Sequence, residues 1–213
     1  VRYIGAGALA AAGIISLVKS LPLICKTFAS AIKGLKGTDS SGSNERTSHE
    51  ISIKAVIIGI FITAMAIWLL PPLQAGIVSA ILIVVFGFFF ATVSSKMVGL
   101  VGSSNNPVSG MAIATLLIST ILLKISGDTG AHGMVSAITI GSIICVIAAI
   151  AGDTSQDLKT GYLLGATPKK QQIGELIGAV ISALTIGGIL ILLNSAWGFG
   201  SKNLAAPQAT LMK

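Results

Sequence analysis

The sequence has little charge. Only 10% of its 213 residues are Asp, Glu, Lys or Arg, whereas a soluble domain needs roughly a quarter of its residues charged to cover its surface. Apolar residues make up 53% of the chain, and the mean hydropathy is +0.92. This shortage of charge excludes a surface that faces water over most of its area, and it indicates an integral membrane protein.

Cysteines and reactive motifs are also scarce. Cys25 and Cys145 are the only cysteines, and we interpret both as packing residues rather than a disulfide pair. The chain has no Gly-rich phosphate loop after a strand, no CxxC pair and no HExxH helix. Asp128 and His132, in the turn GDTGAHG, make only an incomplete metal site. We therefore expect neither an enzyme nor a bound metal or cofactor.

Long apolar runs fill most of the chain. A spanning helix needs about 20 mainly apolar residues, and six segments meet or approach that length: residues 3–18, 51–70, 75–95, 107–125, 134–151 and 172–193. The sequence therefore predicts an all-α fold, a multi-pass transmembrane bundle of about six helices that forms a single domain in contact with the lipid bilayer.

The stretch between the first two spans has a different composition. Over residues 19–36, lysines recur every seven positions on one helical face and apolar residues recur on another, which predicts a basic amphipathic helix on the membrane surface. The alternative is that the first span continues past Pro22 into solvent. Residues 37–50 are rich in Gly, Ser, Thr and Asn, a composition typical of a polar linker.

Basic residues are unevenly divided between the two sides of the predicted bundle. One side carries Lys19, Lys26, Lys33, Lys36, Arg46, Lys54, Lys96, Lys159, Lys169 and Lys170. The other carries only Arg2, Lys124 and Lys202. Because Lys and Arg are retained in the cytoplasm, residues 71–73, 126–133 and 194–206 are predicted to lie outside. The same basic residues lie between apolar runs, without interleaved aromatics, so we expect no nucleic-acid partner.

The first polar break, residues 99–110, reads GLVGSSNNPVSG. Asn106 followed by Pro107 resembles an N-cap with proline at the first helical position, and it predicts the start of a helix. The break is either a short cytoplasmic loop or a re-entrant or broken helix. Transporters use broken helices because free amides and the positive end of a helix dipole can face an anionic group of a substrate.

The second polar break covers residues 152–172. Carboxylates close to membrane depth are costly unless they pair, line water or carry protons, so Asp153 and Asp157 are candidates for coupling or gating. At a spacing of four they would share a helical face, and Asp157 is also placed to pair with Lys159. The alternative is a solvated loop whose acidic residues balance its lysines.

The last apolar span has a clear start signal. Thr167 and Pro168 read as an N-cap and a first helical residue. Glu175 lies about 10 Å further along the helix, either as a proton-binding carboxylate facing the bundle or as a side chain that snorkels to the cytoplasmic interface. Small residues recur every four positions from Gly174 to Ser182, a pattern that predicts a closely packed helix pair.

Both breaks resemble signature stretches of the oligopeptide transporter (OPT) family. The matching segments are SSNNPVSGM at residues 103–111 and GDTSQDLKTGYLLGATPKKQQ at residues 152–172. The C-terminal LAAPQATLMK resembles the opening of that family's next conserved segment, with Ala205 where a proline is usual. The resemblance implies a secondary carrier that moves peptides or metal–chelate complexes using a proton gradient. It also implies many more helices than six, so that this chain would be a fragment of a larger transporter, which we expect in the cytoplasmic membrane of a bacterium.

The resemblance also implies which residues line or gate the substrate pathway. They are Asn105, Asn106, Pro107, Ser109, Gly110, Gln156, Asp157, Lys159, Thr160 and Gly161. The candidates for proton coupling are Asp153, Asp157 and Glu175. The expected partners are protons, a peptide or metal–chelate substrate, and the remaining helices of the full-length transporter. A channel or a structural membrane protein is the alternative, although no filter-like repeat is present.

Overall fold

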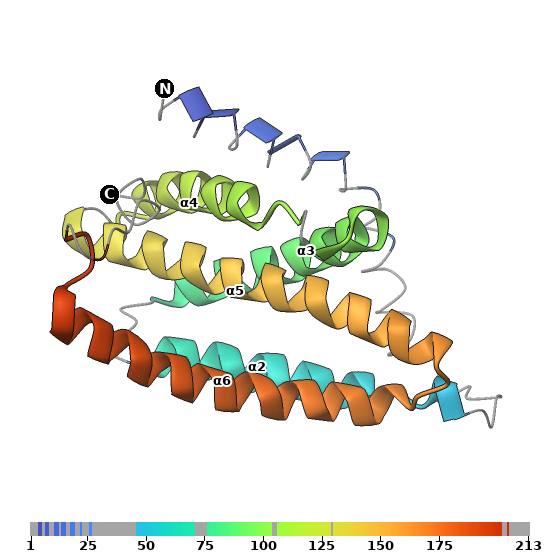
Figure 1. The fold of residues 1–213 in the computed structure, drawn as a ribbon. Coiled ribbons are helices and arrows are strands. Elements are labelled where there is room, and N and C mark those ends of the chain that lie inside the picture. Colours follow the sequence, from blue (N-terminus) through green and yellow to red (C-terminus); the bar gives the residue numbers. More distant parts are fainter. Residues whose placement is uncertain are drawn as a thin grey trace.

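The computed structural model describes residues 46–70, 76–103, 106–128, 130–201 and 204, with isolated positions between 4 and 26. The predicted span at 3–18, the amphipathic helix at 19–36 and most of the linker therefore lie largely outside the described residues. The described ranges contain a short 3-10 helix and five α-helices, with no strand: η1 (Arg46–Ser48), α2 (Ile53–Leu69), α3 (Ile77–Val101), α4 (Val108–Ile125), α5 (Gly130–Leu163) and α6 (Pro168–Trp197) (Figure 1). All five α-helices are long and apolar enough to cross a membrane, which confirms the predicted helical transmembrane bundle.

Helix α5 differs from the sequence-based expectation. The apolar run was expected to end near residue 151, but the helix continues to Leu163, so most of the second polar break is helical rather than a loop. Its 34 residues extend about 51 Å, well beyond a hydrocarbon core of about 30 Å. The polar end of α5 is therefore a helical extension past the apolar stretch, and it reaches the turn that leads to α6.

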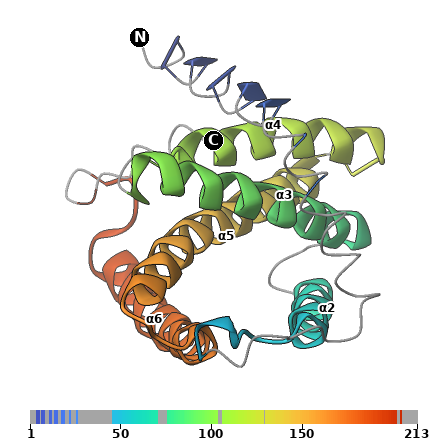
Figure 2. The ribbon, with the colours of Figure 1, turned by 90° about the vertical axis from the view of Figure 1, so that its right-hand side faces the viewer.

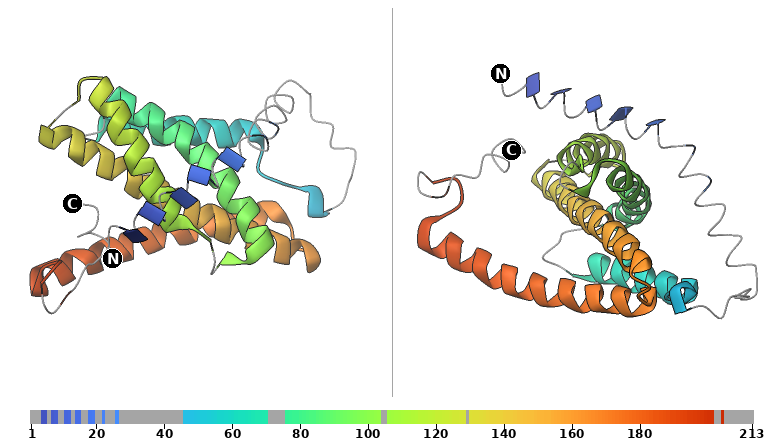
Figure 3. Two further views of the ribbon diagram at one scale, coloured as in Figure 1. Left: turned by 90° about the horizontal axis from the view of Figure 1, so that it is seen from above. Right: turned by 45° about the vertical axis from the view of Figure 1, so that its right-hand side comes forward.

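Helices α3, α4 and α5 form the packed centre of the described structure (Figures 1 and 3). Phe90, Met111, Ile140 and Ile144 are completely buried between them. Glycine allows the close approach of these helices: a Cβ atom added at Gly141 of α5 would lie 2.8 Å from the Leu116 side chain of α4. The packing of these three helices determines where the polar groups of the two signature segments meet.

Helices α2 and α6 lie at the periphery of this three-helix centre. Figure 2 shows them on opposite sides below α5, and the right-hand view of Figure 3 shows α6 diverging from α5 toward its C-terminal end. Ile67 is the one buried residue of α2, and Pro168 is the one buried residue of α6. A Cβ atom at Gly174 or Gly178 would meet nothing within 4 Å. The predicted close helix pair along α6 is therefore not formed with any described helix.

The turn between α5 and α6 is a Schellman motif. Ala166 N–H donates to Gly161 O (2.8 Å) and Gly165 N–H donates to Tyr162 O (3.1 Å), the pair of bonds that defines this helix end. Gly165 has a φ of 72°, a conformation that glycine adopts without steric cost. The motif sets the direction in which α6 leaves α5, and it brings the first two turns of α6 against the end of α5.

Candidate functional site

The first polar break lies at the junction of α3, α4 and α5. Helix α4 begins at Val108 with Pro107 at the N-cap position, and no side chain caps it. The predicted N-cap role of Asn106 is therefore wrong. Its side chain instead lies between α3 and α5, where Nδ2 donates to Ser94 Oγ (2.7 Å) and, over a longer distance, to Ala148 O (3.4 Å). Asn106 therefore donates through Nδ2 to other helices, whereas Oδ1, the atom with which an N-cap accepts a backbone N–H, has no partner among the described residues.

Gly152 leaves room for this contact. A Cβ atom at Gly152 would lie 2.7 Å from Asn106 Nδ2, 2.8 Å from Val98 Cγ2 and 3.0 Å from Ser94 Oγ. The Ser94 hydroxyl also donates to Ala148 O, in a short hydrogen bond between α3 and α5. The first break is therefore in contact with the residue that opens the second break.

The junction is only partly satisfied by hydrogen bonds. Asn106 Oδ1 is buried and accepts no hydrogen bond from the described residues, an arrangement that typically costs about 1–3 kcal/mol. Nearby, Gly110 is buried, Pro107 is partly buried and Ser109 is exposed, while Asn105 lies outside the described residues. Gly152 lies eleven residues before the end of α5, so the junction is about 16 Å from that end along the helix.

A second polar site lies between the end of α5 and the start of α6. It is a pocket of about 290 Å³ that is open to the surface, and it is lined by Asp157, Thr160, Gly161, Leu164, Ala166, Gln171 and Glu175. The pocket brings together three of the pathway candidates, Asp157, Thr160 and Gly161, and two of the proton-coupling candidates, Asp157 and Glu175. Glu175 thus faces the polar end of α5 and is partly buried there, which favours the bundle-facing interpretation over snorkelling.

Gln171 makes the closest contact across this pocket. Its Nε2 donates to Asp157 O (3.2 Å), and a Cβ atom at Gly161 would lie only 2.0 Å from Gln171 Oε1. Any larger residue at position 161 would therefore displace the amide. Gln171 Oε1 and Glu175 Oε1 are both buried, and neither has a hydrogen-bond partner among the described residues. The pocket wall thus carries two buried acceptors with no donor.

Five candidates are exposed on the α5 extension: Asp153, Gln156, Asp157, Lys159 and Thr160. Of these, Asp157 and Thr160 also line the pocket. The Lys159 ammonium lies over the Tyr162 ring, 5.5 Å from its centroid, and no ion pair with Asp157 is formed. The predicted Asp157–Lys159 pair is therefore wrong. Thr167 does hold the N-cap position of α6, but its side chain makes no capping bond.

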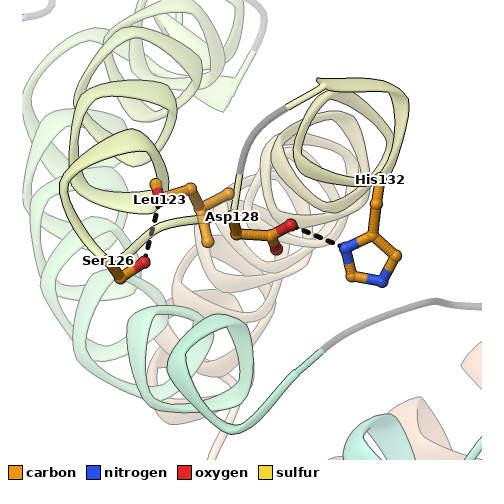
Figure 4. Close-up of polar contacts among 4 residues, drawn as sticks. All are labelled: Leu123, Ser126, Asp128 and His132. Carbon is orange, nitrogen blue, oxygen red and sulfur yellow. Dashed lines mark hydrogen bonds and ion pairs between the residues drawn. The ribbon is translucent and has the colours of Figure 1, made fainter.

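The turn between α4 and α5 holds a hydrogen-bonded contact between a histidine and a carboxyl group, the one contact of this kind found among the described residues. His132 Nδ1 lies 2.7 Å from Asp128 Oδ1 (Figure 4), and both side chains are partly exposed. Within the described part of the chain, no group of three His, Cys, Asp or Glu residues is placed to hold a metal ion. Cys145 is a free, partly buried thiol, and Cys25 lies outside the described residues.

Sequence reasoning missed three residues that the structure places in these sites. Ser94 lies in the middle of an apolar run, and nothing local distinguishes it from other helical serines. Gln171 and Gln172 end the second signature segment, but their neighbours are on other helices. The available signal is their position three and four residues after Pro168, close to the predicted start of the last helix.

Comparison with known proteins supplies the family. The family model described as OPT oligopeptide transporter protein matches residues 1–213. A Haemophilus influenzae protein named "Putative oligopeptide transporter" is 35% identical over 245 residues, an alignment that covers all of this chain and 38% of that relative. A Saccharomyces cerevisiae protein of the same description is 33% identical over 106 residues, which are 50% of this chain and 14% of that protein.

The chain thus spans less than two-fifths of the length of the curated relatives it matches. No solved structure matches it. The family match over the whole chain, together with five helices suited to a membrane, makes this an integral membrane protein. The chain belongs to the oligopeptide transporter family, whose members are transport proteins.

Proposed function

We propose that this protein is a proton-driven secondary carrier of oligopeptides, and that the pocket between α5 and α6 holds the coupling proton on Glu175. The observation that carries the proposal is the pair of buried, unpartnered oxygens in that pocket, Glu175 Oε1 and Gln171 Oε1. The family match and the names of the two relatives support a peptide substrate.

The chemistry of the pocket favours a proton as the missing partner. Gln171 and Glu175 are four residues apart on α6, so their side chains lie on the same face of the helix. An ionised carboxylate and an amide oxygen are both acceptors and cannot bond to each other. A proton on Glu175 turns the carboxyl into a donor. A proton on Glu175 would therefore place a donor in a pocket whose two buried oxygens lack one among the described residues, and it would lower the cost of burying the carboxyl group.

The exposed carboxylates differ from Glu175 in this respect. Asp153 and Asp157 are exposed on the α5 extension, where water can hydrate their ionised forms. The backbone carbonyl of Asp157, rather than its carboxylate, accepts the bond from Gln171. We therefore assign proton coupling to Glu175 and regard Asp157 as part of the wall of the pocket.

The junction around Asn106 fits the same mechanism. It interrupts the chain between α3 and α4 next to a packed part of α5, which is where secondary carriers place breaks that line a binding site. Its unpartnered Oδ1 supplies an acceptor for a donor group of the substrate or for water. In alternating access, the three-helix centre and the α5–α6 contact would change their relative position as Glu175 gains or loses its proton.

The test uses the full-length protein reconstituted in liposomes with an imposed pH gradient. Glu175→Gln keeps the size of the side chain but cannot release a proton. We expect uptake of a labelled peptide by this variant to fall to the level measured without a gradient. Exchange of labelled for unlabelled peptide, which needs no net proton movement, should persist.

Asp153→Asn is the control, because Asp153 is an exposed carboxylate of the α5 extension that does not line the pocket. Gradient-driven uptake by Glu175→Gln at the wild-type rate would contradict the assignment of the proton. Wild-type uptake that ignores the pH gradient would contradict the carrier mechanism itself. Competition by a metal–chelate complex, with no competition by peptides, would replace the peptide substrate with the other substrate class of the family.

A further inference from the structure

Two consecutive glutamines at the start of α6 bond to different parts of the protein. Gln171 Nε2 donates to Asp157 O on α5 (3.2 Å), and Gln172 Oε1 accepts from Ile51 N–H, just before α2 (3.0 Å). We propose that Gln172 is a positioning residue that links α2 to the proton-binding pocket, with Gln171 as its counterpart on α5. This inference rests on the function proposed above.

Residues 46–51, called here the strap, are tied to the α5–α6 turn at two further points. Lys169 N–H donates to His49 O (2.9 Å), and the Arg46 guanidinium donates to Gly165 O. These contacts join segments about 120 residues apart in sequence. Figure 1 shows the strap beside the turn between α5 and α6. The segment that leads into α2 is therefore anchored on the α5–α6 turn and the start of α6.

Besides this anchoring, α2 contacts the described structure mainly through α3. Ile67, near the far end of the helix, is its one buried residue. At the other end, the Ile51–Gln172 bond lies two residues before α2 begins. A displacement of the α6 start therefore moves the start of α2 more directly than it moves the packed centre of α3, α4 and α5.

The two glutamines cannot respond independently to such a displacement. Adjacent residues on an α-helix point about 100° apart, so a rotation that carries Gln171 away from Asp157 O also shifts Gln172 against the strap. Gln171 and Glu175 share one pocket wall, so proton binding at Glu175 acts on the same turn. The glutamine pair thereby connects the charge state of the pocket to the position of α2.

The contact is tested first by amide hydrogen exchange on the purified full-length protein. Gln172→Met removes the acceptor of Ile51 N–H, whereas Gln172→Glu keeps an acceptor oxygen at the same distance from the backbone. Lys170→Met is the matched control, because Lys170 is exposed and the variant adds the same side chain in the same turn. We expect exchange at Ile51 to be about tenfold faster in Gln172→Met, as the loss of one protecting hydrogen bond predicts, and unchanged in the other two variants.

The coupling is tested by the ratio of gradient-driven uptake to peptide exchange in liposomes. Gln172→Met should lower this ratio at least fivefold, and Gln172→Glu and Lys170→Met should keep the wild-type ratio. Ile51→Pro removes the same hydrogen bond from the other side, and it serves as the second variant if Gln172→Met does not fold. We expect it to lower the ratio to the same extent.

Two results would overturn the inference while leaving the proposed function intact: a wild-type ratio in Gln172→Met despite faster exchange at Ile51, or an equal loss of both transport activities with the ratio unchanged. Each would show that the strap only supports the fold. Uptake by the wild-type protein that ignores the gradient would instead overturn the proposed function, and this inference with it.

Discussion

Replacement of Gly152 by alanine tests the packing of the junction most directly. The added Cβ would lie 2.7 Å from Asn106 Nδ2, 2.8 Å from Val98 Cγ2 and 3.0 Å from Ser94 Oγ, whereas ordinary contact begins at 3.4 Å. The three neighbours must therefore retreat by about 0.4 to 0.7 Å, or α3 and α5 must separate. Because two of these atoms belong to the hydrogen-bonded Asn106–Ser94 pair, the substitution affects packing and polar contacts together.

The expected loss of stability follows from both effects. Overpacking of a closely packed helix contact costs about 1–3 kcal/mol. Displacing the Asn106 amide from its bond to Ser94 adds about 1 kcal/mol. Together these give a loss of roughly 2–4 kcal/mol for Gly152→Ala. In a long full-length protein, whose unfolding entropy is large, this should lower the melting temperature by roughly 1–3 °C.

Gly174→Ala is the matched control for this measurement. A Cβ at Gly174 meets nothing within 4 Å, and alanine favours a helix over glycine by up to about 1 kcal/mol, so this variant should melt at or slightly above the wild-type temperature. Val98→Ala in the Gly152→Ala background removes one of the colliding atoms, and the double variant should lose less stability than the sum of the single variants. A melting temperature of Gly152→Ala equal to that of wild type would refute the close approach of α3 and α5.

Two further substitutions compare the α5–α6 pocket with the turn between α4 and α5. Gly161→Ala places a Cβ 2.0 Å from Gln171 Oε1. Because the flexible Gln171 side chain can move away, we expect a loss of only about 1 kcal/mol of stability in a thermal melt, together with a clear loss of gradient-driven uptake. Normal uptake by this variant would show that Gln171 is dispensable. Asp128→Asn removes the carboxyl group that contacts His132. Because Asp128 is 25% exposed and His132 is 55% exposed, stability should fall by less than about 1 kcal/mol. Peptide uptake by Asp128→Asn should equal uptake by the wild-type protein, both in the presence and in the absence of a metal chelator. A loss of uptake that depends on the chelator would indicate that this turn binds a metal.

The sequence was a good guide to the class of fold and a poorer guide to where one helix ends. Hydropathy measures where a helix stops being apolar, which for α5 is near residue 151. The helix itself ends where backbone geometry demands it, at the Schellman turn around Gly165 and ahead of Pro168. That stop signal, a glycine followed closely by a proline, is present in the sequence. The predicted span nevertheless ends where the polar residues begin, which leaves a solvated loop as one of two interpretations of the intervening segment.

The contacts of the candidate site depend on distances that no local pattern contains. Asn106 has the residue type and the following proline of an N-cap, yet its amide binds Ser94 on α3. That outcome depends on how closely α3 and α5 approach, and Gly152, 46 positions further along the chain, is what permits the approach. The sequence therefore indicated that Asn106 is special but assigned it the wrong partner.

The glycines of α5 and α6 also show that a local sequence pattern does not predict which helices approach each other closely. A regular small-residue pattern predicted close packing along α6, where the glycines face no described neighbour, while the close contacts occur at Gly141 and Gly152 of α5. These two residues are eleven positions apart, which at about 100° per residue places them almost on one line along the helix, three turns from each other. A spacing of eleven marks a helical face as well as a spacing of four does. Because α4 approaches that face at Gly141 and the Asn106–Ser94 pair approaches it at Gly152, this one face of α5 holds the packed centre and the polar junction in a fixed relation.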